Sequence, residues 1–275
     1  MKGCDTTFMK KTTELLPVSV VVITLNEERN IERLLKSVSW ASEVVVYDSG
    51  STDSTCAIAQ KMGAKVFQGD WLGFGPTKRK AVNLATQDWI LSLDADEEVP
   101  EVLFAELREM WPRLSPQKRY QIPRLSWYLN RWIGHGGWYP DFQIRLFHRR
   151  YANWNTAEIH EKVEMLKTAE APEFKVEKLT SPFHHYVFKN IEHQVHTNNK
   201  YSSLQAQQMA QAGRRFSWFH FLTKPFVKFI ECYILKLGFL DGWAGYVIAR
   251  SAAYSVFLKW AKLKELEQLA ECQHD

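Results

Sequence analysis

The sequence has few cysteines, no secretory leader pattern and no apolar run long enough to cross a bilayer. It contains only four cysteines, which lie far apart and form no CxxC pair: Cys4, Cys56, Cys232 and Cys272. This spacing matches neither a zinc site nor a disulfide framework and fits a reducing compartment. The first sixteen residues mix Lys, Asp, Glu and Thr, unlike a signal peptide. No stretch approaches the roughly 18 uncharged apolar residues of a spanning helix. We therefore expect a cytoplasmic protein.

A glycine-rich nucleotide motif is also missing after the first expected strand. The β-branched run Val18–Leu25 is followed by Asn26 and Glu27, where a GxGxxG or P-loop sequence would otherwise stand. This disfavours a dinucleotide-binding dehydrogenase and a P-loop NTPase. Asn26 instead has the side chain of a helix cap.

Strand and helix patterns alternate through the first hundred residues. Apolar and β-branched runs predict strands at 18–25, 43–47, 64–67 and 88–93, and helical spacing or start signals predict helices near 31–38, 53–62 and 76–85. A βαβαβαβ order predicts an open, mostly parallel α/β sheet. With 275 residues, 45% of them hydrophobic, the chain can form one large α/β domain with an elaboration or two modest domains.

Acidic and polar side chains follow three of these expected strands. Asn26, Asp48 and the pair Asp94/Asp96 come directly after a strand. Ligands of parallel sheets bind beyond the carboxyl ends of the strands. Carboxylate oxygens suit Mg²⁺, which usually takes one or two of them and leaves its other positions to water and phosphates. The pair therefore predicts either a divalent-metal site or, more simply, an acidic turn.

The middle of the chain contains two further strand patterns, at 120–125 and 142–148, on either side of the glycine-rich segment 134–138. Beyond Pro182 the pattern becomes helical, and 245–264 has the spacing of an amphipathic helix. Glycines in the segment 134–138 allow backbone to approach a ligand closely.

The C-terminal third is basic and aromatic, although the net charge of the whole chain is only +4. Between Lys200 and Lys264 there are ten Lys/Arg and two acids, interleaved with aromatic residues. Such a composition suits an anionic membrane surface or nucleic acid. The basic residues lie on apolar helices, and no RNA-binding signature is present, which favours the membrane surface and no nucleic acid.

Four segments in this order resemble the inverting GT-A glycosyltransferases of family 2: 19–27, 46–53, 78–85 and 88–97. Downstream, 140–148, 159–161, 185–186 and 241–245 are similar to the branch that builds the lipopolysaccharide inner core, most of all to its β-1,4-glucosyltransferases. The resemblance implies a GT-A fold (a Rossmann-like, mostly parallel sheet) with a helical C-terminal extension. It implies an N-terminal extension over 1–17, a catalytic domain over 18–186 and a helical basic-aromatic region over 187–275.

The resemblance also implies donor-side roles. Asn26 and Glu27 would lie under the nucleotide, and Asp48 would bind the uridine or ribose. Lys78 would meet the diphosphate, Asp94 would bridge ribose and metal, and Asp96 would hold a divalent metal, Mg²⁺ or Mn²⁺. The simpler alternatives are a first-turn acid for Glu27, an Asx turn for Asp48 and a solvated helix face for Lys78. Asp53 has the position of a residue that starts its helix.

The general base and the rest of the metal shell fall in the second half of the chain. Glu161 is the preferred base and Asp141 the alternative, and an ion pair is the simpler role for Glu161. His185 is similar to the histidine that completes the metal shell in many GT-A enzymes, with His184 as its alternative. Arg145 would contact the diphosphate or an acceptor phosphate.

Together these features predict transfer of a hexose, glucose first, from a UDP-sugar to the heptose of lipid-anchored lipopolysaccharide core. The enzyme would be peripheral on the inner face of the bacterial inner membrane. The alternatives are a UDP-sugar transferase acting on a polyprenyl phosphate or other polysaccharide, a metal-dependent phosphohydrolase, and a basic-aromatic nucleic-acid-binding protein.

Overall fold

The computed structural model describes residues 15–157, 161–166 and 175–272, which fall into two compact units. The first comprises Met1–Gln121 and Ile144–Leu179, and the second comprises Ile122–Gln143 and Thr180–Asp275. Residues 122–143 belong with the C-terminal helices because Tyr128 and Ile133 share an apolar core with Ala244 and Ile248. These units are compact by their own contacts, and the predicted domains over 18–186 and 187–275 stay predictions.

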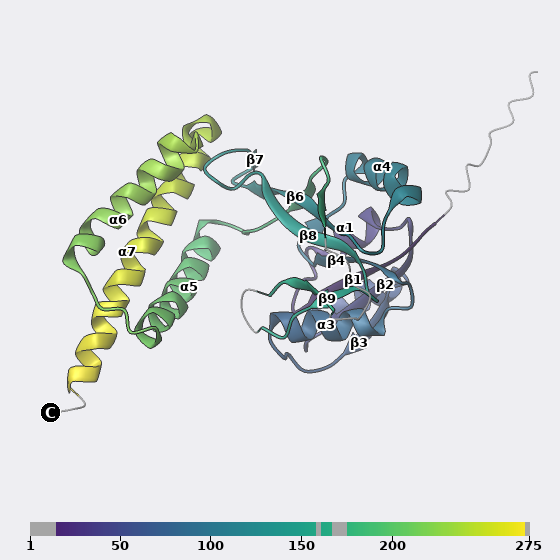
Figure 1. Cartoon of the computed structure of the whole chain (residues 1–275), viewed down its shortest axis with the longest axis horizontal. Coiled ribbons are helices and arrows are strands. Elements are labelled where there is room, and N and C mark those ends of the chain that lie inside the picture. Colours follow the sequence, from purple (N-terminus) through teal and green to yellow (C-terminus); the bar gives the residue numbers. More distant parts are fainter. Residues whose placement is uncertain (1–14, 158–160, 167–174, 273–275) are drawn as a thin grey trace, which may run out of the picture. The chain divides into compact units, whose positions relative to one another are not determined.

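The first unit is built on four parallel strands in the order β3-β2-β1-β4. They are β1 (Leu16–Thr24), β2 (Ala41–Asp48), β3 (Lys65–Gln68) and β4 (Trp89–Asp94). The last seven residues of β1 are all buried, as its unbroken β-branched run predicts for a strand covered on both faces. Strand β8 (Asp141–His148) pairs antiparallel to β4. The predicted α/β class with a mostly parallel sheet is confirmed (Figure 1).

The helices that connect these strands lie close to their predicted places. They are α1 (Ile31–Ser37), α2 (Thr55–Lys61) and α3 (Phe74–Leu84), followed by α4 (Glu101–Met110) and the short 3-10 turn η1 (Trp111–Arg113). The proposed cap at Asn26 is wrong. Helix α1 begins later, after Asn30, and Asn26 has a left-handed backbone with φ of 57°. Asparagine tolerates this conformation better than most residues.

The remaining strands are mostly short, and sequence patterns did not predict most of them. The long strand is β6 (Arg119–Tyr128), and the short ones are β5 (Glu97–Glu98), β7 (Arg131–Ile133), β9 (Ala152–Trp154), β10 (Val163–Met165), β11 (Val176–Lys178) and β12 (Phe183–His185). Two- and three-residue strands carry too few residues for an alternating pattern.

The second unit ends in three long helices, α5 (Ile191–Gln211), α6 (Trp218–Ile230) and α7 (Gly242–Cys272). Between α6 and α7 lie a π-helical turn η2 (Glu231–Leu235) and a 3-10 turn η3 (Gly238–Asp241). Both α5 and α6 pack along α7 (Figure 1). Helix α7 extends beyond the predicted 245–264 because no proline or glycine interrupts it after Gly245. No helix within the described residues is both long and apolar enough to cross a membrane.

Candidate active site at the strand ends

The carboxyl ends of the central strands bring the predicted donor-side residues to one edge of the sheet. In the parallel register, Thr24 at the end of β1 is level with Asp48 of β2, and Ile23 is level with Asp94 of β4. The convergence expected from the strand order is therefore confirmed. Asp48 is buried, while Asp94 keeps 29% of its side chain exposed. The edge thus has a carboxylate that solvent and ligands can reach.

Asp94 is the centre of a charged group that we call the strand-end cluster: Lys78, Asp94, Glu97, Arg145 and Glu161. Asp94 Oδ1 lies 2.9 Å from Lys78 Nζ, and its Oδ2 accepts a hydrogen bond of 2.7 Å from Arg145 Nη2. Arg145 also pairs with Glu97, whose other oxygen accepts a 3.0 Å bond from the backbone N–H of Asp94. The carboxylate of Asp94 is therefore fixed in orientation by two cations.

Lys78 joins Asp94 to the predicted base. Helix α3 places Lys78 on a buried face, with its Nζ 3.0 Å from Glu161 Oε1 and 4.6 Å from the ring centre of Trp154. The solvated helix face considered from the sequence is therefore wrong for Lys78. A buried ammonium needs paired carboxylates to offset its lost hydration, and here it has two.

The charges of this cluster reinforce one another. Burial opposes ionisation of Asp94, but the positive charges of Arg145 and Lys78 outweigh it and hold the pKa of Asp94 well below its usual range. Burial likewise opposes the charge on Arg145, while Asp94 and Glu97 raise the pKa of Arg145 above its usual value. Both groups are thus charged at neutral pH.

The cluster has the donor chemistry for a divalent metal without forming a complete cage. Among the described residues, no three His, Cys, Asp or Glu side chains are grouped closely enough to hold a metal ion. With the half-buried Asp96, the cluster contains four carboxylates and two cations, a formal balance of −2. That balance would repel a diphosphate and attract a divalent cation. Mg²⁺ commonly binds through one or two carboxylates and substrate phosphates, so these residues fit it.

Asp48 and Asn26 organise the loop that follows β2. Asp48 Oδ2 accepts hydrogen bonds from the backbone N–H groups of Gly50 (3.1 Å) and Ser51 (2.9 Å), which is the Asx turn considered as its simpler role. Asn26 Oδ1 accepts a 2.9 Å bond from the N–H of Thr52. These two side chains tie the ends of β1 and β2 to one loop.

Glu27 and Asp53 also have local partners. Glu27 Oε2 accepts a 2.7 Å bond from the Asn30 side chain, and its backbone N–H donates to the Thr55 hydroxyl over 2.8 Å. Asp53 Oδ1 accepts a 3.0 Å bond from the N–H of Thr55 at the start of α2. Slight desolvation opposes the ionisation of Asp53, but this bond and those from the Thr55 hydroxyl and the N–H of Glu28 lower its pKa. Asp53 therefore starts its helix, as one alternative predicted.

Asp141, the alternative base, lies in the second unit and is held by other side chains. Both Nε and Nη2 of Arg124 donate to Asp141 Oδ2, the former over 2.9 Å. Gln143 Nε2 donates to Asp141 Oδ1 over 2.7 Å. Both oxygens of Asp141 therefore accept hydrogen bonds, and Arg124 and Gln143 hold its carboxylate in place.

The two histidines considered for the metal shell are also in the second unit. His185 is buried in β12, and its Nδ1 lies 3.3 Å from the Ser126 hydroxyl. His184 packs its ring against Trp132, with 4.0 Å between ring centres. His160, which precedes the predicted base Glu161 in the chain, lies outside the described residues.

Asp241, the first residue of the segment 241–245, holds a loop in place. Asp241 is buried and accepts hydrogen bonds from the backbone N–H groups of Gly134 (3.3 Å) and His135 (2.8 Å). The His135 ring lies 3.1 Å from the same carboxylate, and Arg131 donates to the backbone carbonyl of Asp241 over 2.7 Å. Asp241 therefore anchors the glycine-rich segment that precedes Asp141.

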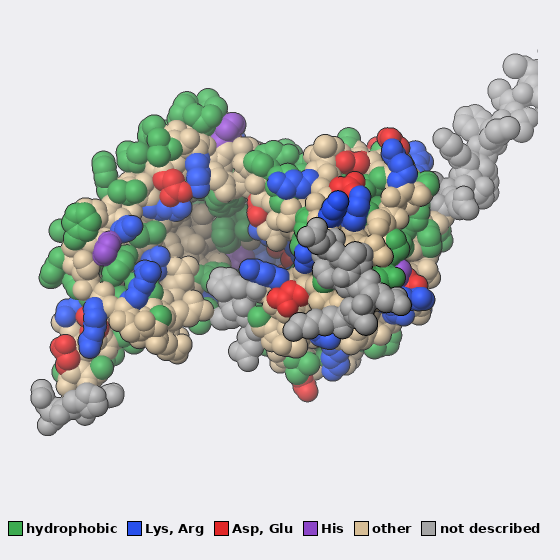
Figure 2. Space-filling view, viewed as in Figure 1, with side chains coloured by type: hydrophobic (Ala, Val, Ile, Leu, Met, Phe, Trp, Pro, Cys, Tyr) green, Lys and Arg blue, Asp and Glu red, His purple; other side chains and the backbone are tan. Residues whose placement is uncertain are grey.

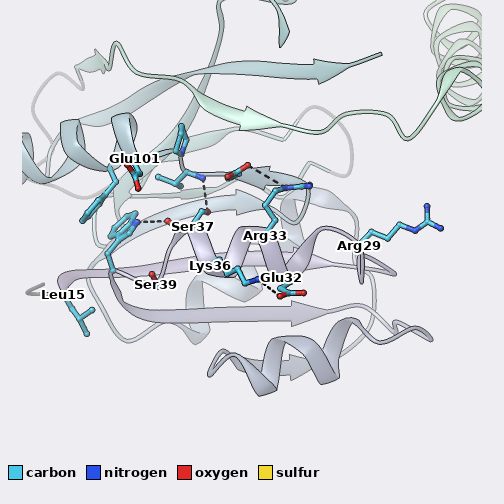
Figure 3. Close-up of a pocket in the computed structure, with 13 residues that line it drawn as sticks. Leu15, Arg29, Glu32, Arg33, Lys36, Ser37, Ser39 and Glu101 are labelled. Carbon is cyan, nitrogen blue, oxygen red and sulfur yellow. Dashed lines mark hydrogen bonds and ion pairs between the residues drawn. The ribbon is translucent and has the colours of Figure 1, made fainter. Parts of the chain in front are cut away.

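A separate pocket of about 780 Å³ lies in the first unit beside α1 and the start of α4 (Figure 3). Four of its charged side chains form pairs, Lys36 with Glu32 over 2.6 Å and Arg33 with Glu98 over 3.9 Å. No residue of the strand-end cluster lines it. The candidate active site is therefore the cluster at the strand ends rather than this pocket.

The chain is similar to several known proteins. The sequence model of glycosyl transferase family 2 matches residues 19–161, a range that contains the whole strand-end cluster. An uncharacterized glycosyltransferase from Rickettsia typhi is 33% identical over 90% of this chain and 87% of its own length. The lipopolysaccharide core biosynthesis glycosyltransferase LpsC from Rhizobium meliloti is 27% identical over 92% of this chain and 94% of its own. Among solved structures, glucosyl-3-phosphoglycerate synthase from Mycobacterium tuberculosis is 28% identical, with a TM-score of 0.33 over 40% of this chain and 44% of that one. By its family model and its relatives, the chain belongs to glycosyltransferase family 2.

Proposed function

We propose that this glycosyltransferase moves a hexose, glucose in the first instance, from a UDP-sugar to a heptose of lipopolysaccharide inner core, with inversion. The observation that carries the proposal is the strand-end cluster, in which Lys78 links the donor-side Asp94 to Glu161. The near full-length similarity to LpsC supports a lipopolysaccharide-core acceptor. Since such an acceptor is lipid-anchored, the enzyme would act at the inner face of the inner membrane.

On the donor side, Asn26, Glu27 and Asp48 would receive the uridine and ribose at the ends of β1 and β2. Asp96, with Asp94 beside it, would hold Mg²⁺ or Mn²⁺. The bound metal would offset the negative charge that grows on the departing diphosphate. Arg145 is too enclosed between Asp94 and Glu97 for the diphosphate contact first expected, so we assign it the role of orienting Asp94.

On the acceptor side, Glu161 would act as the general base. The acceptor hydroxyl attacks the anomeric carbon, its proton passes to the Glu161 carboxylate, and the bond from that carbon to the UDP oxygen breaks with its electron pair. A single in-line displacement inverts the configuration at the anomeric carbon. Lys78, whose Nζ lies 3.0 Å from Glu161 Oε1, would hold the Glu161 carboxylate in position before the proton arrives.

A panel of UDP-sugars tests this function directly. Purified enzyme is incubated with each UDP-sugar and a heptose-containing core acceptor, with and without a chelator, and a polyprenyl phosphate serves as the competing acceptor. We expect transfer from UDP-glucose to the core acceptor and its loss on chelation. Transfer to the polyprenyl phosphate alone would show that the proposed acceptor is wrong. Activity unaffected by the chelator would show that the reaction needs no metal.

A pair of isosteric substitutions tests the base. Glu161→Gln should lower turnover by roughly 10²- to 10⁴-fold, since a positioned base contributes about that much. Asp141→Asn should lower it less, because Asp141 is already engaged by Arg124 and Gln143. UDP-sugar binding is measured in parallel and should persist in both variants. Near-normal turnover of Glu161→Gln with a severe loss in Asp141→Asn would exchange the two roles.

A further inference from the structure

Helix α6 has apolar side chains on two faces, and only one of them is covered. On the inner face, the ring of Phe221 lies 5.0 Å from that of Phe257, and Phe229 lies 5.9 Å from Tyr246, both on α7. On the outer face, Trp218, Phe219, Leu222 and Phe226 are each 67–70% exposed, and no residue of α6 is buried. The outer face repeats at i, i+4 and i+8, which gives a continuous stripe along the helix.

The turns that follow α6 extend the same kind of surface. Leu235, Leu240 and Trp243, in η2, η3 and the first turn of α7, are 73%, 52% and 62% exposed. Of the twenty-six large hydrophobic side chains that are exposed among the described residues, twelve lie within 218–246. A concentration of this kind marks a surface that meets another apolar phase. We call residues 218–243 with these exposed side chains the aromatic ridge.

Cations surround the aromatic ridge. Between residues 214 and 240 there are five Lys/Arg and one acid: Arg214, Arg215, Lys224, Lys228, Lys236 and Glu231. Glu231 pairs with Lys228 over 3.0 Å and with Lys236 over 2.5 Å, so it sits inside the basic set. Figure 2 shows green hydrophobic side chains with blue Lys and Arg among them over α6 and α7.

We propose that the aromatic ridge is a docking surface for an anionic lipid bilayer. Exposed Trp and Phe side chains would enter the headgroup boundary, where tryptophan is favoured, and the flanking cations would pair with anionic headgroups. A second copy of this chain fits less well, because a two-fold contact through the ridge would place the five cations of one copy against those of the other. Since no described helix can span a membrane, the contact is peripheral.

This proposal rests on and deepens the proposed function, because a lipid-anchored acceptor lies at such a surface, yet it can fail independently.

The ridge also adjoins the anchor of the glycine-rich segment. The backbone N–H of Gly136 donates to the carbonyl of Lys236 over 2.8 Å, and Asp241 lies between Leu240 and Trp243 in the chain. Docking would therefore place that segment close to the lipid headgroups.

Vesicle flotation tests the proposal without any sugar transfer. The full chain is mixed with vesicles of phosphatidylcholine alone or with about one third phosphatidylglycerol, and the floated fraction is measured at two salt concentrations. We expect binding to the anionic vesicles that weakens as salt rises, because headgroup pairing is screened. The triple variant Trp218→Ser, Phe219→Ser, Phe226→Ser should partition roughly tenfold or more weakly, since its apolar contact is removed.

A matched control uses exposed side chains of α5 in the same unit. Val195 and Tyr201 are 46% and 45% exposed, and Val195→Ser with Tyr201→Ser should float like the wild type. Circular dichroism shows that each variant is folded. Equal flotation of the ridge variant and the wild type would overturn the proposal. So would failure of the wild type to bind anionic vesicles, or a concentration-dependent dimer that the ridge variant abolishes. If the wild type floats with anionic vesicles but transfers no sugar, that result would count against the proposed function alone.

Discussion

Asp94 in the first unit and Asp241 in the second are both engaged carboxylates, but their partners differ in kind. Asp94 meets side-chain cations, Lys78 and Arg145, and remains partly open at the edge of the sheet. Asp241 is buried and accepts mainly from the backbone N–H groups of a loop. The first arrangement concentrates charged groups at the edge of the sheet, and the second fixes the conformation of a loop.

These two kinds of partner predict different responses to substitution. A group of opposed charges depends on every member, because removing one leaves its buried partners with one counter-charge fewer. A loop anchor depends on hydrogen-bond acceptors, and an amide can replace part of a carboxylate in that role. Substitutions in the strand-end cluster should therefore affect transfer most, whereas those around Asp241 should affect stability and loop order.

Between the surroundings of Asp94 and those of Asp241, the largest effect is expected from Asp94→Asn. The amide keeps the shape but removes the charge that Lys78 and Arg145 face, so turnover should fall by roughly 10²- to 10³-fold, as for a lost electrostatic group at a reacting centre. Steady-state transfer assays measure it. Asp88→Asn is the control, since Asp88 pairs with His148, Arg149 and Arg150, none of which belongs to the strand-end cluster, and turnover should change little. Near-normal turnover of Asp94→Asn would show that the charge at the strand ends has no role in the reaction.

Next is Gly245→Ala in α7, which tests the packing around the loop anchor. Alanine normally favours a helix over glycine by about 1 kcal/mol. Here a Cβ at position 245 would lie 1.8 Å from the Gly238 carbonyl oxygen, so we expect a net destabilisation of about 1–3 kcal/mol from overpacking. Thermal or urea unfolding measures it. Gly134→Ala is the control, because its nearest neighbour would be 3.9 Å away. A more stable Gly245→Ala would show that η3 moves freely against α7.

Asp241→Asn should have a smaller effect. One acceptor oxygen remains for the N–H groups of Gly134 and His135, so we expect a loss of about 1–2 kcal/mol in the free energy of unfolding. Transfer should decline less than in Asp94→Asn. Hydrogen exchange of the 134–137 amides reports loop order directly and should quicken. Turnover falling as far as in Asp94→Asn would mean that the anchor takes part in the chemistry.

The smallest effect on turnover should come from Glu43, a buried carboxylate near the start of β2, whose role is in stability. Burial raises its pKa, but hydrogen bonds from Lys65, Ser19 and Thr86 prevail and lower it from 4.5 to about 2. A lowered folded-state pKa stabilises the protein above pH 4.5, and this contribution is lost as the pH falls toward about 2.

Glu43→Gln should therefore flatten the acid limb of the stability curve in that window. Urea unfolding at several pH values measures it, with the exposed Glu109→Gln as control. An unchanged acid limb would show that Glu43 does not contribute to acid sensitivity.

The parallel core was predictable because its signals are local. The β-branched run of β1 and the acids at the ends of β2 and β4 lie in short, continuous stretches, and parallel register then brings Asp48 and Asp94 to one edge. The pairing of Arg145 with Asp94 and Glu97 was not predictable, since about fifty residues separate the partners. Glu97 could have been noticed, because an acid that follows two functional carboxylates needs a cation if it is buried.

Contiguous patterns in the sequence are enough to identify the family and the alternation of strands and helices in the core, and they predict the donor-side residues. Only the tertiary structure decided which charges neutralise one another and which surfaces remain uncovered. A solvated helix face was the simpler alternative for Lys78, which is buried between two carboxylates, and only the packing of α6 on α7 shows that Trp218 and Phe226 are left exposed. Burial and pairing depend on what the rest of the chain packs against, and no local pattern contains that information.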